Sequence, residues 1–199
     1  LEFRRVLFRS SADWGVMHPS RERVILALLV IVQICQMVDF MIAVPLGPQL
    51  MRELGIGPGQ FGMLLAVYAL SAAVAGFIAA LFVDRFDRRR TLILLYAGFG
   101  CTALVAGLAP GYGVLLLTRV FAGAFGGVLG GTVLAIVTDV FPPERRARAL
   151  AAVLSAFSMV LILGLPFSIA LATWFGWRAP YLALAMICLV SLPGCMLLL

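Results

Sequence analysis

The chain contains 199 residues, of which 63% are hydrophobic and 12% are charged. Charged residues are about half as frequent as in a soluble domain, and one soluble core of this size could not bury so much apolar surface. The composition therefore excludes an ordinary soluble enzyme, a disordered chain and a collagen-like fibre. Because a membrane-spanning helix needs about 20 apolar residues, the length allows at most about six spans.

Residues 1–23 precede the first long apolar run, and we expect them to form an N-terminal tail. Residues 1–10 (LEFRRVLFRS) lack the long apolar core and the cleavage site of a signal peptide. We interpret them as a cloning or assembly remnant and leave them out of the fold prediction. We expect the native start at Met17, with the first span acting as a signal anchor.

Six apolar runs follow, separated by glycine, proline and arginine residues. Each is predicted to be a transmembrane helix, since a helix satisfies its own backbone polar groups in lipid. The predicted spans are residues 24–46, 58–83, 91–109, 112–140, 149–175 and 179 onwards. The sequence thus predicts an all-α membrane protein with one six-helix bundle over residues 24–199, in which the sixth helix is truncated. Three spans on each side of Pro110, starting from opposite faces, are what a 3+3 inverted repeat would give.

All fifteen basic residues are arginines, and their distribution predicts the orientation of the bundle. Twelve lie in the tail or in the connections after the second and fourth spans, and Arg52 and Arg178 lie on the other side. The positive-inside rule therefore places the N-terminus in the cytoplasm, and we expect a bacterial inner-membrane protein. The arginines form no continuous basic face, so we expect the lipid bilayer and no nucleic acid as a partner. The four cysteines follow no metal-ligand spacing, and we expect no metal and no cofactor.

Polar side chains lie inside the first span. Asp39 is preceded at intervals of three by Gln36 and Gln33, which places all three within about 120° of one helix face. A charge inside hydrocarbon is costly, so Asp39 is a functional candidate by default. It either titrates a proton or contacts a cationic or polar substrate, and the alternative is a static packing and hydrogen-bonding residue. Gln33 and Gln36 are candidate substrate contacts.

A second charge, Arg119, lies inside the fourth span. Glycines follow it at spacings of four, at Gly123, Gly127 and Gly131. This row predicts the close approach of a neighbouring helix, but a packing seam does not need a guanidinium. Asp39 is the one carboxylate placed at membrane depth, besides Asp139 at the inner end of the same span. We therefore hypothesise that Arg119 and Asp39 interact, directly or through water.

The fifth span contains Gly164 and Pro166. A proline inside a helix removes one backbone hydrogen bond and bends the helix. The sequence therefore predicts a bend, which is either a moving hinge or a fixed kink. The chain holds a single histidine, His18 in the tail, and no H-E-x-x-H or G-x-S-x-G motif, so we expect no enzyme activity.

The connection after the second span, ALFVDRFDRRR over residues 80–90, resembles the loop signature of the major facilitator superfamily, G-x-x-x-D-R-x-G-R-R/K-R/K. The matching residues are Asp84, Arg85, Arg88, Arg89 and Arg90. Ala80 and Asp87 stand where the family has glycines. Residues 39–45 are similar to the first span of proton-coupled drug exporters. Arg119 with Gly123 resembles the family's R-x-x-x-G signature.

The G-x-P at residues 164–166 and the G-W-R at residues 176–178 resemble the drug and sugar exporter (arabinose-efflux-like) branch. This resemblance implies the N-terminal half of a twelve-helix transporter that exports a sugar, drug or related molecule by alternating access. Asp39 and Arg119 would then couple transport to protons, and the Asp84 loop would act as a cytoplasmic gate. The implied partners are a small-molecule substrate, protons, the bilayer and a missing C-terminal half of the same chain. The alternative is a non-transporting receptor or assembly subunit on the same fold.

Overall fold

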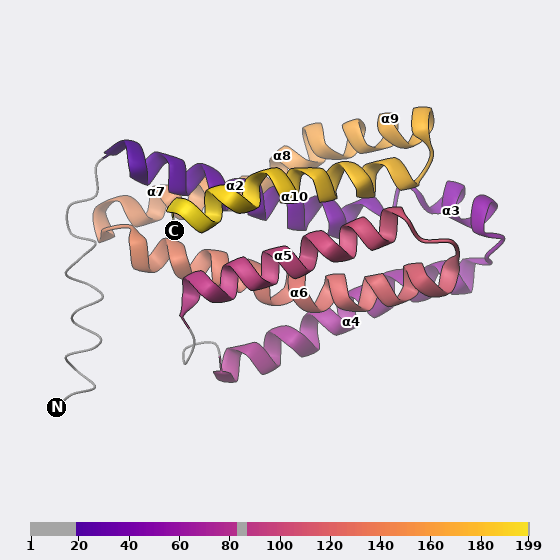
Figure 1. Ribbon diagram of the computed structural model, residues 1–199, viewed down its shortest axis with the longest axis horizontal. Coiled ribbons are helices and arrows are strands. Elements are labelled where there is room, and N and C mark those ends of the chain that lie inside the picture. The colour runs from indigo at the N-terminus through magenta and orange to yellow at the C-terminus, as the bar shows by residue number, and fades with distance from the viewer. Residues whose placement is uncertain (1–18, 83–86, 199) are drawn as a thin grey trace.

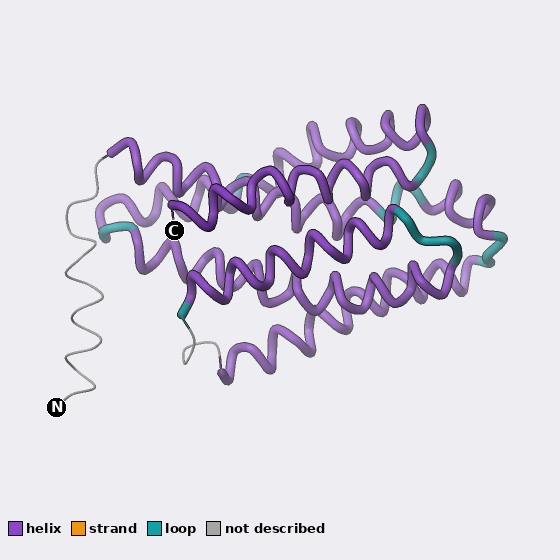
Figure 2. The backbone as a smooth tube through the Cα atoms, in the orientation of Figure 1, coloured by secondary structure: helices purple, strands orange, loops and turns teal. Residues whose placement is uncertain are grey.

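The computed structural model describes residues 19–82 and 87–198, and within these ranges it contains helices and no strand. Six of its helical runs are long and apolar enough to cross a membrane. They lie side by side as an elongated bundle, joined by short loops (Figures 1 and 2). The predicted all-α membrane fold with six spans is confirmed for this part of the chain.

Each predicted span corresponds to a helix or a chain of helices. The first four spans are α2 (Pro19–Ile42), α4 (Pro58–Phe82), α5 (Arg88–Gly107) and α6 (Tyr112–Val140). The fifth span joins α7 (Pro143–Leu154), α8 (Ala156–Met159), the π-helical turn η2 (Val160–Gly164) and α9 (Leu165–Phe175). The sixth span is α10 (Arg178–Leu198). The inverted relation between the two sets of three spans stays a prediction.

Helix α2 begins five residues earlier than the sequence predicted, and helices α5 and α7 begin earlier as well, at or just before the arginine clusters. Helix α5 begins at Arg88 because the Asp87 side chain caps it, accepting from the backbone N–H of Arg89 at 3.4 Å. Helix α7 begins at Pro143, a residue suited to the first turn because it lacks a backbone N–H. Residues 88–90 are therefore held on the first turn of α5, and the arginines at 145, 146 and 148 on the first two turns of α7.

A short helix, α3 (Gly47–Leu54), lies between the first two spans, where we expected a loop. Pro48 stands in its first turn, and Gly55 ends it with a φ of +63°, which a residue with a side chain rarely adopts. Leu50 is buried and anchors the helix. A helix this short and half polar leaves no apolar run long enough to stand out in the sequence.

Helix α6 is packed closely against α4 through its glycines. A Cβ at Gly127 would lie 2.7 Å from the Cα of Ala72, and one at Gly123 would overlap the backbone carbonyl of Tyr68. Nothing lies within 4 Å of a Cβ at Gly131. The close contact between the second and fourth spans is therefore made by Gly123 and Gly127, and the row continues past it at Gly131.

The spans differ widely in the share of their residues that is buried inside the bundle. In the most apolar stretch of the first and the fourth span, 44% of the residues are buried. The figure falls to 11% in the second span and 17% in the fifth. Large apolar side chains such as Phe77 and Trp174 are exposed there. The second and fifth spans thus present wide apolar faces, which only lipid or further protein can cover.

The fifth span changes its helical geometry where the bend was predicted. The turn Val160–Gly164 is π-helical, and Pro166 stands in the first turn of α9. Because proline has no N–H to donate, a local change of hydrogen-bond register before it relieves the conflict. A Cβ at Gly164 would lie 3.2 Å from Cγ2 of Val38, so this glycine lets the fifth span approach the first.

The first turns of α2, α5 and α7 lie at one end of the bundle, and α3 lies at the other (Figure 1). We call the former the arginine-rich end, after Arg23, residues 88–90 and residues 145–148. Which side of the membrane it faces stays a prediction.

Candidate functional site

The first and fourth spans are joined by an ion pair inside the bundle. Nη2 of Arg119 in α6 lies 2.9 Å from Oδ1 of Asp39 in α2. Nη1 of Arg119 also donates to the backbone carbonyl of Asp39, at 3.4 Å. The Arg119 and Asp39 side chains are 2% and 1% exposed. The structure thus brings together the two charges that the sequence placed at membrane depth, where each offsets the desolvation of the other.

This pair leaves part of its hydrogen-bonding capacity unused. Oδ2 of Asp39 and Nε of Arg119 are buried without a hydrogen-bond partner among the described residues. A carboxylate accepts at both oxygens, and a guanidinium carries five N–H donors. A proton or a bridging water molecule could therefore bind at Oδ2 without displacing Arg119.

Two tyrosines hold the arginine from outside the pair. The guanidinium carbon of Arg119 lies 5.6 Å from the ring centre of Tyr68 in α4 and 5.0 Å from that of Tyr181 in α10. Both distances are within the range of cation–π attraction. The Tyr68 hydroxyl is buried without a hydrogen-bond partner among the described residues. Arg119 therefore contacts side chains from the first, second and sixth spans.

No feature of the sequence singles out these tyrosines, because an aromatic side chain in an apolar helix is ordinary. A link between them and Arg119 appears only when three separate helices are packed together.

The two glutamines extend the polar face of α2 toward the arginine-rich end. Nε2 of Gln33 donates to Oε1 of Gln36 at 3.2 Å. Oε1 of Gln36 lies 3.9 Å from the position of a Cβ at Gly130, so this side chain faces α6. Oε1 of Gln33 is buried and unpartnered within the described part of the chain. Gln33 and Gln36 lie outside the lining of the cavity described next.

An open cavity of about 770 Å³ lies beside the ion pair, between the first, second, fourth and fifth spans. Its walls are mostly apolar and include Phe40, Met41, Leu64, Leu65, Leu161 and Leu165. Arg119 and Tyr68 are the two lining residues with polar side chains. Such a cavity, apolar with a few convergent polar groups, is the usual form of a small-molecule site. We call it the apolar cavity.

The predicted gating loop is described in part. Asp84 and Arg85 lie outside the described residues. Nε of Arg88 lies 2.8 Å from Oδ2 of Asp139, which ties the start of α5 to the end of α6. The Arg89 guanidinium donates to the backbone carbonyl of Met196 in α10, and Nε of Arg90 lies 3.7 Å from Oδ2 of Asp87. These arginines thus connect the third, fourth and sixth spans at the arginine-rich end.

The chemistry that the buried site offers is proton exchange, charge pairing and hydrogen bonding. Asp39 is an acceptor at two oxygens, Arg119 is a permanent cation and Tyr68 is both donor and acceptor. Within the described ranges, no three His, Cys, Asp or Glu side chains gather where they could hold a metal ion.

Comparison with known proteins identifies the family to which the chain belongs. Residues 29–199 match the model of the Major Facilitator Superfamily. The chain is 29% identical over 168 residues to a chloramphenicol resistance protein of Streptomyces lividans, covering 83% of this chain and 43% of that protein. It is 32% identical over 127 residues to a chloramphenicol efflux pump of Mycobacterium tuberculosis, covering 64% of this chain and 31% of the pump. The chain therefore spans less than half the length of these relatives.

Solved structures share the fold at low sequence identity. A bacterial homologue of the human lysosomal transporter Spinster, in an inward-facing and unoccupied conformation, matches with a TM-score of 0.74 and 21% identity. The match covers 92% of this chain and 44% of that one. A peptide transporter, POT, in complex with alafosfalin matches with a TM-score of 0.76 at 14% identity, over 86% of this chain and 37% of that one. The chain belongs to the Major Facilitator Superfamily, and its six spans correspond to half of that fold.

Proposed function

We propose that this chain is the N-terminal six-helix half of a proton-coupled exporter of small amphipathic molecules that works by alternating access. The observation that carries the proposal is the buried Asp39–Arg119 pair, in which Arg119 also lines the apolar cavity. One side chain thus contacts both a group that can accept a proton and a space that can accept a substrate.

Coupling follows from the charge balance of this pair. With Asp39 ionised, Arg119 is held by the carboxylate at 2.9 Å. A proton on Oδ2 neutralises Asp39 and weakens that hold, leaving the guanidinium against the rings of Tyr68 and Tyr181. Because Arg119 and Tyr68 line the cavity, a shift of the guanidinium changes its polar surface. The membrane potential supplies about 2.3 kcal/mol per charge per 100 mV to such a cycle.

The lining of the cavity indicates the class of substrate. Its apolar walls favour an uncharged ring or chain, and Arg119 is the one charged side chain in its lining and can interact with a polar group of the substrate. Two relatives carry names that refer to chloramphenicol. Chloramphenicol is a small amphipathic molecule of this class, and we choose it as the probe substrate. Gln33 and Gln36 lie outside the cavity lining, and their role as substrate contacts would require access from the arginine-rich end.

A second six-helix half would complete the substrate path. The wide apolar faces of α4 and of the fifth span are surfaces on which it could pack. The loop containing Asp84, Arg85 and Arg88 would latch the two halves at the arginine-rich end, which we assign to the cytoplasm of a bacterial cell. In this account the fifth-span bend at Gly164 and Pro166 allows the helix to rock.

The proposal is tested in inverted membrane vesicles that carry this chain together with its second half. Chloramphenicol is added to energised vesicles, and proton movement is followed with a pH-sensitive dye. We expect substrate-driven proton movement, its loss in Asp39→Asn, and its retention in Glu53→Gln, which alters an exposed carboxylate of α3. Binding of the probe with no proton movement in the unmodified protein would favour a receptor or assembly subunit and contradict the proposal.

A further inference from the structure

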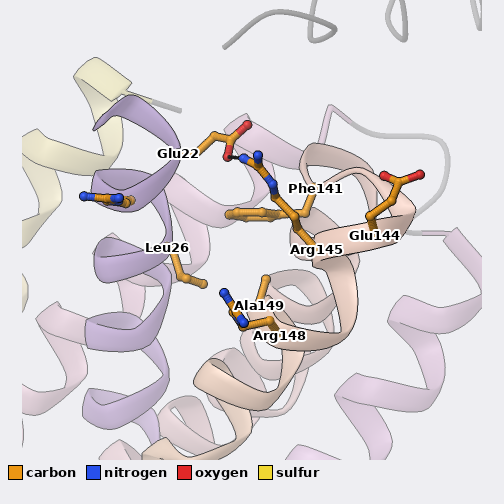
Figure 3. A pocket seen from close by; sticks show the side chains of 8 residues that line it. Glu22, Leu26, Phe141, Glu144, Arg145, Arg148 and Ala149 are labelled. Atoms are coloured by element: carbon orange, nitrogen blue, oxygen red, sulfur yellow. Dashed lines mark hydrogen bonds and ion pairs between the residues drawn. The ribbon is translucent and has the colours of Figure 1, made fainter. Parts of the chain in front are cut away.

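A second cavity lies at the arginine-rich end, far from the buried ion pair. It has a volume of about 510 Å³ and opens between the first turns of α2 and of α7 (Figure 3). Its floor is apolar, formed by Leu26, Phe141 and Ala149, and the remaining lining side chains are charged. We call it the arginine cleft. We propose that the arginine cleft binds the phosphate group of an anionic phospholipid.

The charges of the cleft do not cancel. Nη1 of Arg145 lies 3.1 Å from Oε2 of Glu22, so this arginine and this carboxylate neutralise each other at the rim. Figure 3 shows the Glu144 carboxylate directed away from α2 and the Arg148 guanidinium directed into the gap, beside Leu26. Within the described part of the chain, Arg23 and Arg148 form no ion pair. The cleft therefore holds the unpaired guanidinium group of Arg148, and Arg23 belongs to its lining on the α2 side.

A phosphate group is the ligand that an unpaired guanidinium group recognises best. The planar fork of arginine donates two parallel hydrogen bonds to phosphate oxygens. When the exposed side chain of Arg23 turns toward the gap, the two arginines could hold one phosphate between them, and this would link the first span to the fifth. Neither arginine would have to break an existing ion pair to do so.

The position and the floor of the cleft favour a lipid over a soluble phosphate. The helical runs of the first and fifth spans begin at Glu22 and Pro143, and their apolar sequence begins at Val24 and Ala149. The cleft therefore lies where the apolar stretches end, at the depth of the headgroups. Basic pockets between transmembrane helices at this depth bind anionic headgroups. The side chains of Leu26 and Phe141 would lie beside the glycerol and upper acyl carbons, a contact that a soluble phosphate cannot make.

The proposal is tested on the detergent-purified chain by native mass spectrometry, counting the lipids that stay bound. Phosphatidylglycerol and phosphatidylcholine are titrated separately, and glycerol 3-phosphate is added as a soluble competitor. We expect specific binding of phosphatidylglycerol, about fivefold weaker in Arg148→Gln and in Arg23→Gln, because each arginine near an anionic surface contributes about that factor. Arg148→Lys, which keeps the charge, should recover part of the loss.

Arg52→Gln is the matched control, since Arg52 is an exposed arginine of α3 at the opposite end of the bundle. Equal binding by Arg148→Gln and Arg52→Gln would overturn the proposal, as would equal binding of the two lipids. Displacement of the lipid by equimolar glycerol 3-phosphate would assign the cleft to a soluble phosphate and overturn the lipid source. All three arginines are exposed, so these substitutions leave the packed core intact.

Discussion

Two arginine–carboxylate pairs of this protein have almost the same length and opposite surroundings. Arg119 and Asp39 lie 2.9 Å apart with 2% and 1% of their side chains exposed. Arg88 and Asp139 lie 2.8 Å apart with 35% and 52% exposed. Breaking one side of a buried pair leaves an uncompensated charge, whereas water replaces the partner in an exposed pair. Burial therefore decides what each contact is worth, and distance alone does not.

The difference also separates the roles that the two regions can have. A proton bound in the buried pair changes the electrostatic balance among four spans, because Arg119 also contacts Tyr68 and Tyr181. A change of charge in the exposed pair is compensated by solvent. We therefore assign the proposed energy conversion to the middle of the bundle, and adjustable contacts between helices to the arginine-rich end.

The largest expected effect comes from removing one side of the buried pair. Asp39→Leu should lower the free energy of unfolding by about 3–5 kcal/mol, because Arg119 would stay buried without its counter-charge. The double substitution Asp39→Leu with Arg119→Met removes both charges and should regain most of that loss. Unfolding in mixed detergent micelles measures both. If the double variant lost as much as the sum of the two single variants, the residues would not be energetically coupled.

The glycine contact between α4 and α6 allows a close-packed glycine to be compared with an unpacked glycine of the same helix. Gly127→Ala should destabilise by about 1–3 kcal/mol, since its Cβ would lie 2.7 Å from the Cα of Ala72 and force a backbone shift. Gly131→Ala is the matched control, because a Cβ there meets nothing within 4 Å. It should be neutral or slightly stabilising, as expected for alanine replacing glycine in a helix. Equal thermal stability of the two variants would contradict the close packing of these spans.

A smaller effect is expected at Tyr68, where ring and hydroxyl can be separated. Tyr68→Leu removes the ring that lies 5.6 Å from the Arg119 guanidinium and should cost about 1–2 kcal/mol. Tyr68→Phe keeps the ring and removes a hydroxyl that has no partner among the described residues, so stability should hardly change. Chemical denaturation of the two variants decides between ring and hydroxyl. Equal damage by both would locate the contribution in the hydroxyl.

The smallest effect is expected at the exposed pair. Asp139→Asn should change the free energy of unfolding by less than about 1 kcal/mol, and the change should shrink as salt is added. The comparison with Asp39→Leu is made in the same detergent at low and high salt. A loss as large as that of the buried pair, unaffected by salt, would show that burial does not separate the two regions.

The sequence was sufficient for the features that depend on one helix at a time. Apolar runs of about 20 residues predicted the six spans, and the rarity of charge inside them singled out Asp39 and Arg119. Arginine clusters predicted the connections between spans. We expected them before the helices, whereas Asp87 and Pro143 start α5 and α7 early enough to include them.

Features made by several helices could not be predicted in this way. Tyr68 and Tyr181 reach Arg119 from different spans, so their spacing along the chain carries no information about the contact. The arginine cleft likewise combines α2 and α7, and α3 is too short for apolar periodicity to reveal it. Helix packing decides such contacts, and it is set by side-chain shape across the whole bundle.

We propose that Asp39 carries the exchanged proton. The number of protons released when the substrate binds tests this proposal. The substrate is the one that drives proton movement in the vesicle experiment. Its heat of binding is measured by calorimetry in two buffers with different ionisation enthalpies, because a released proton is taken up by the buffer and changes the heat. We expect a buffer-dependent heat for the unmodified protein and no buffer dependence for Asp39→Asn, although that variant still binds. Asp139→Asn should behave like the unmodified protein. Equal proton release by Asp39→Asn and the unmodified protein would contradict the proposal.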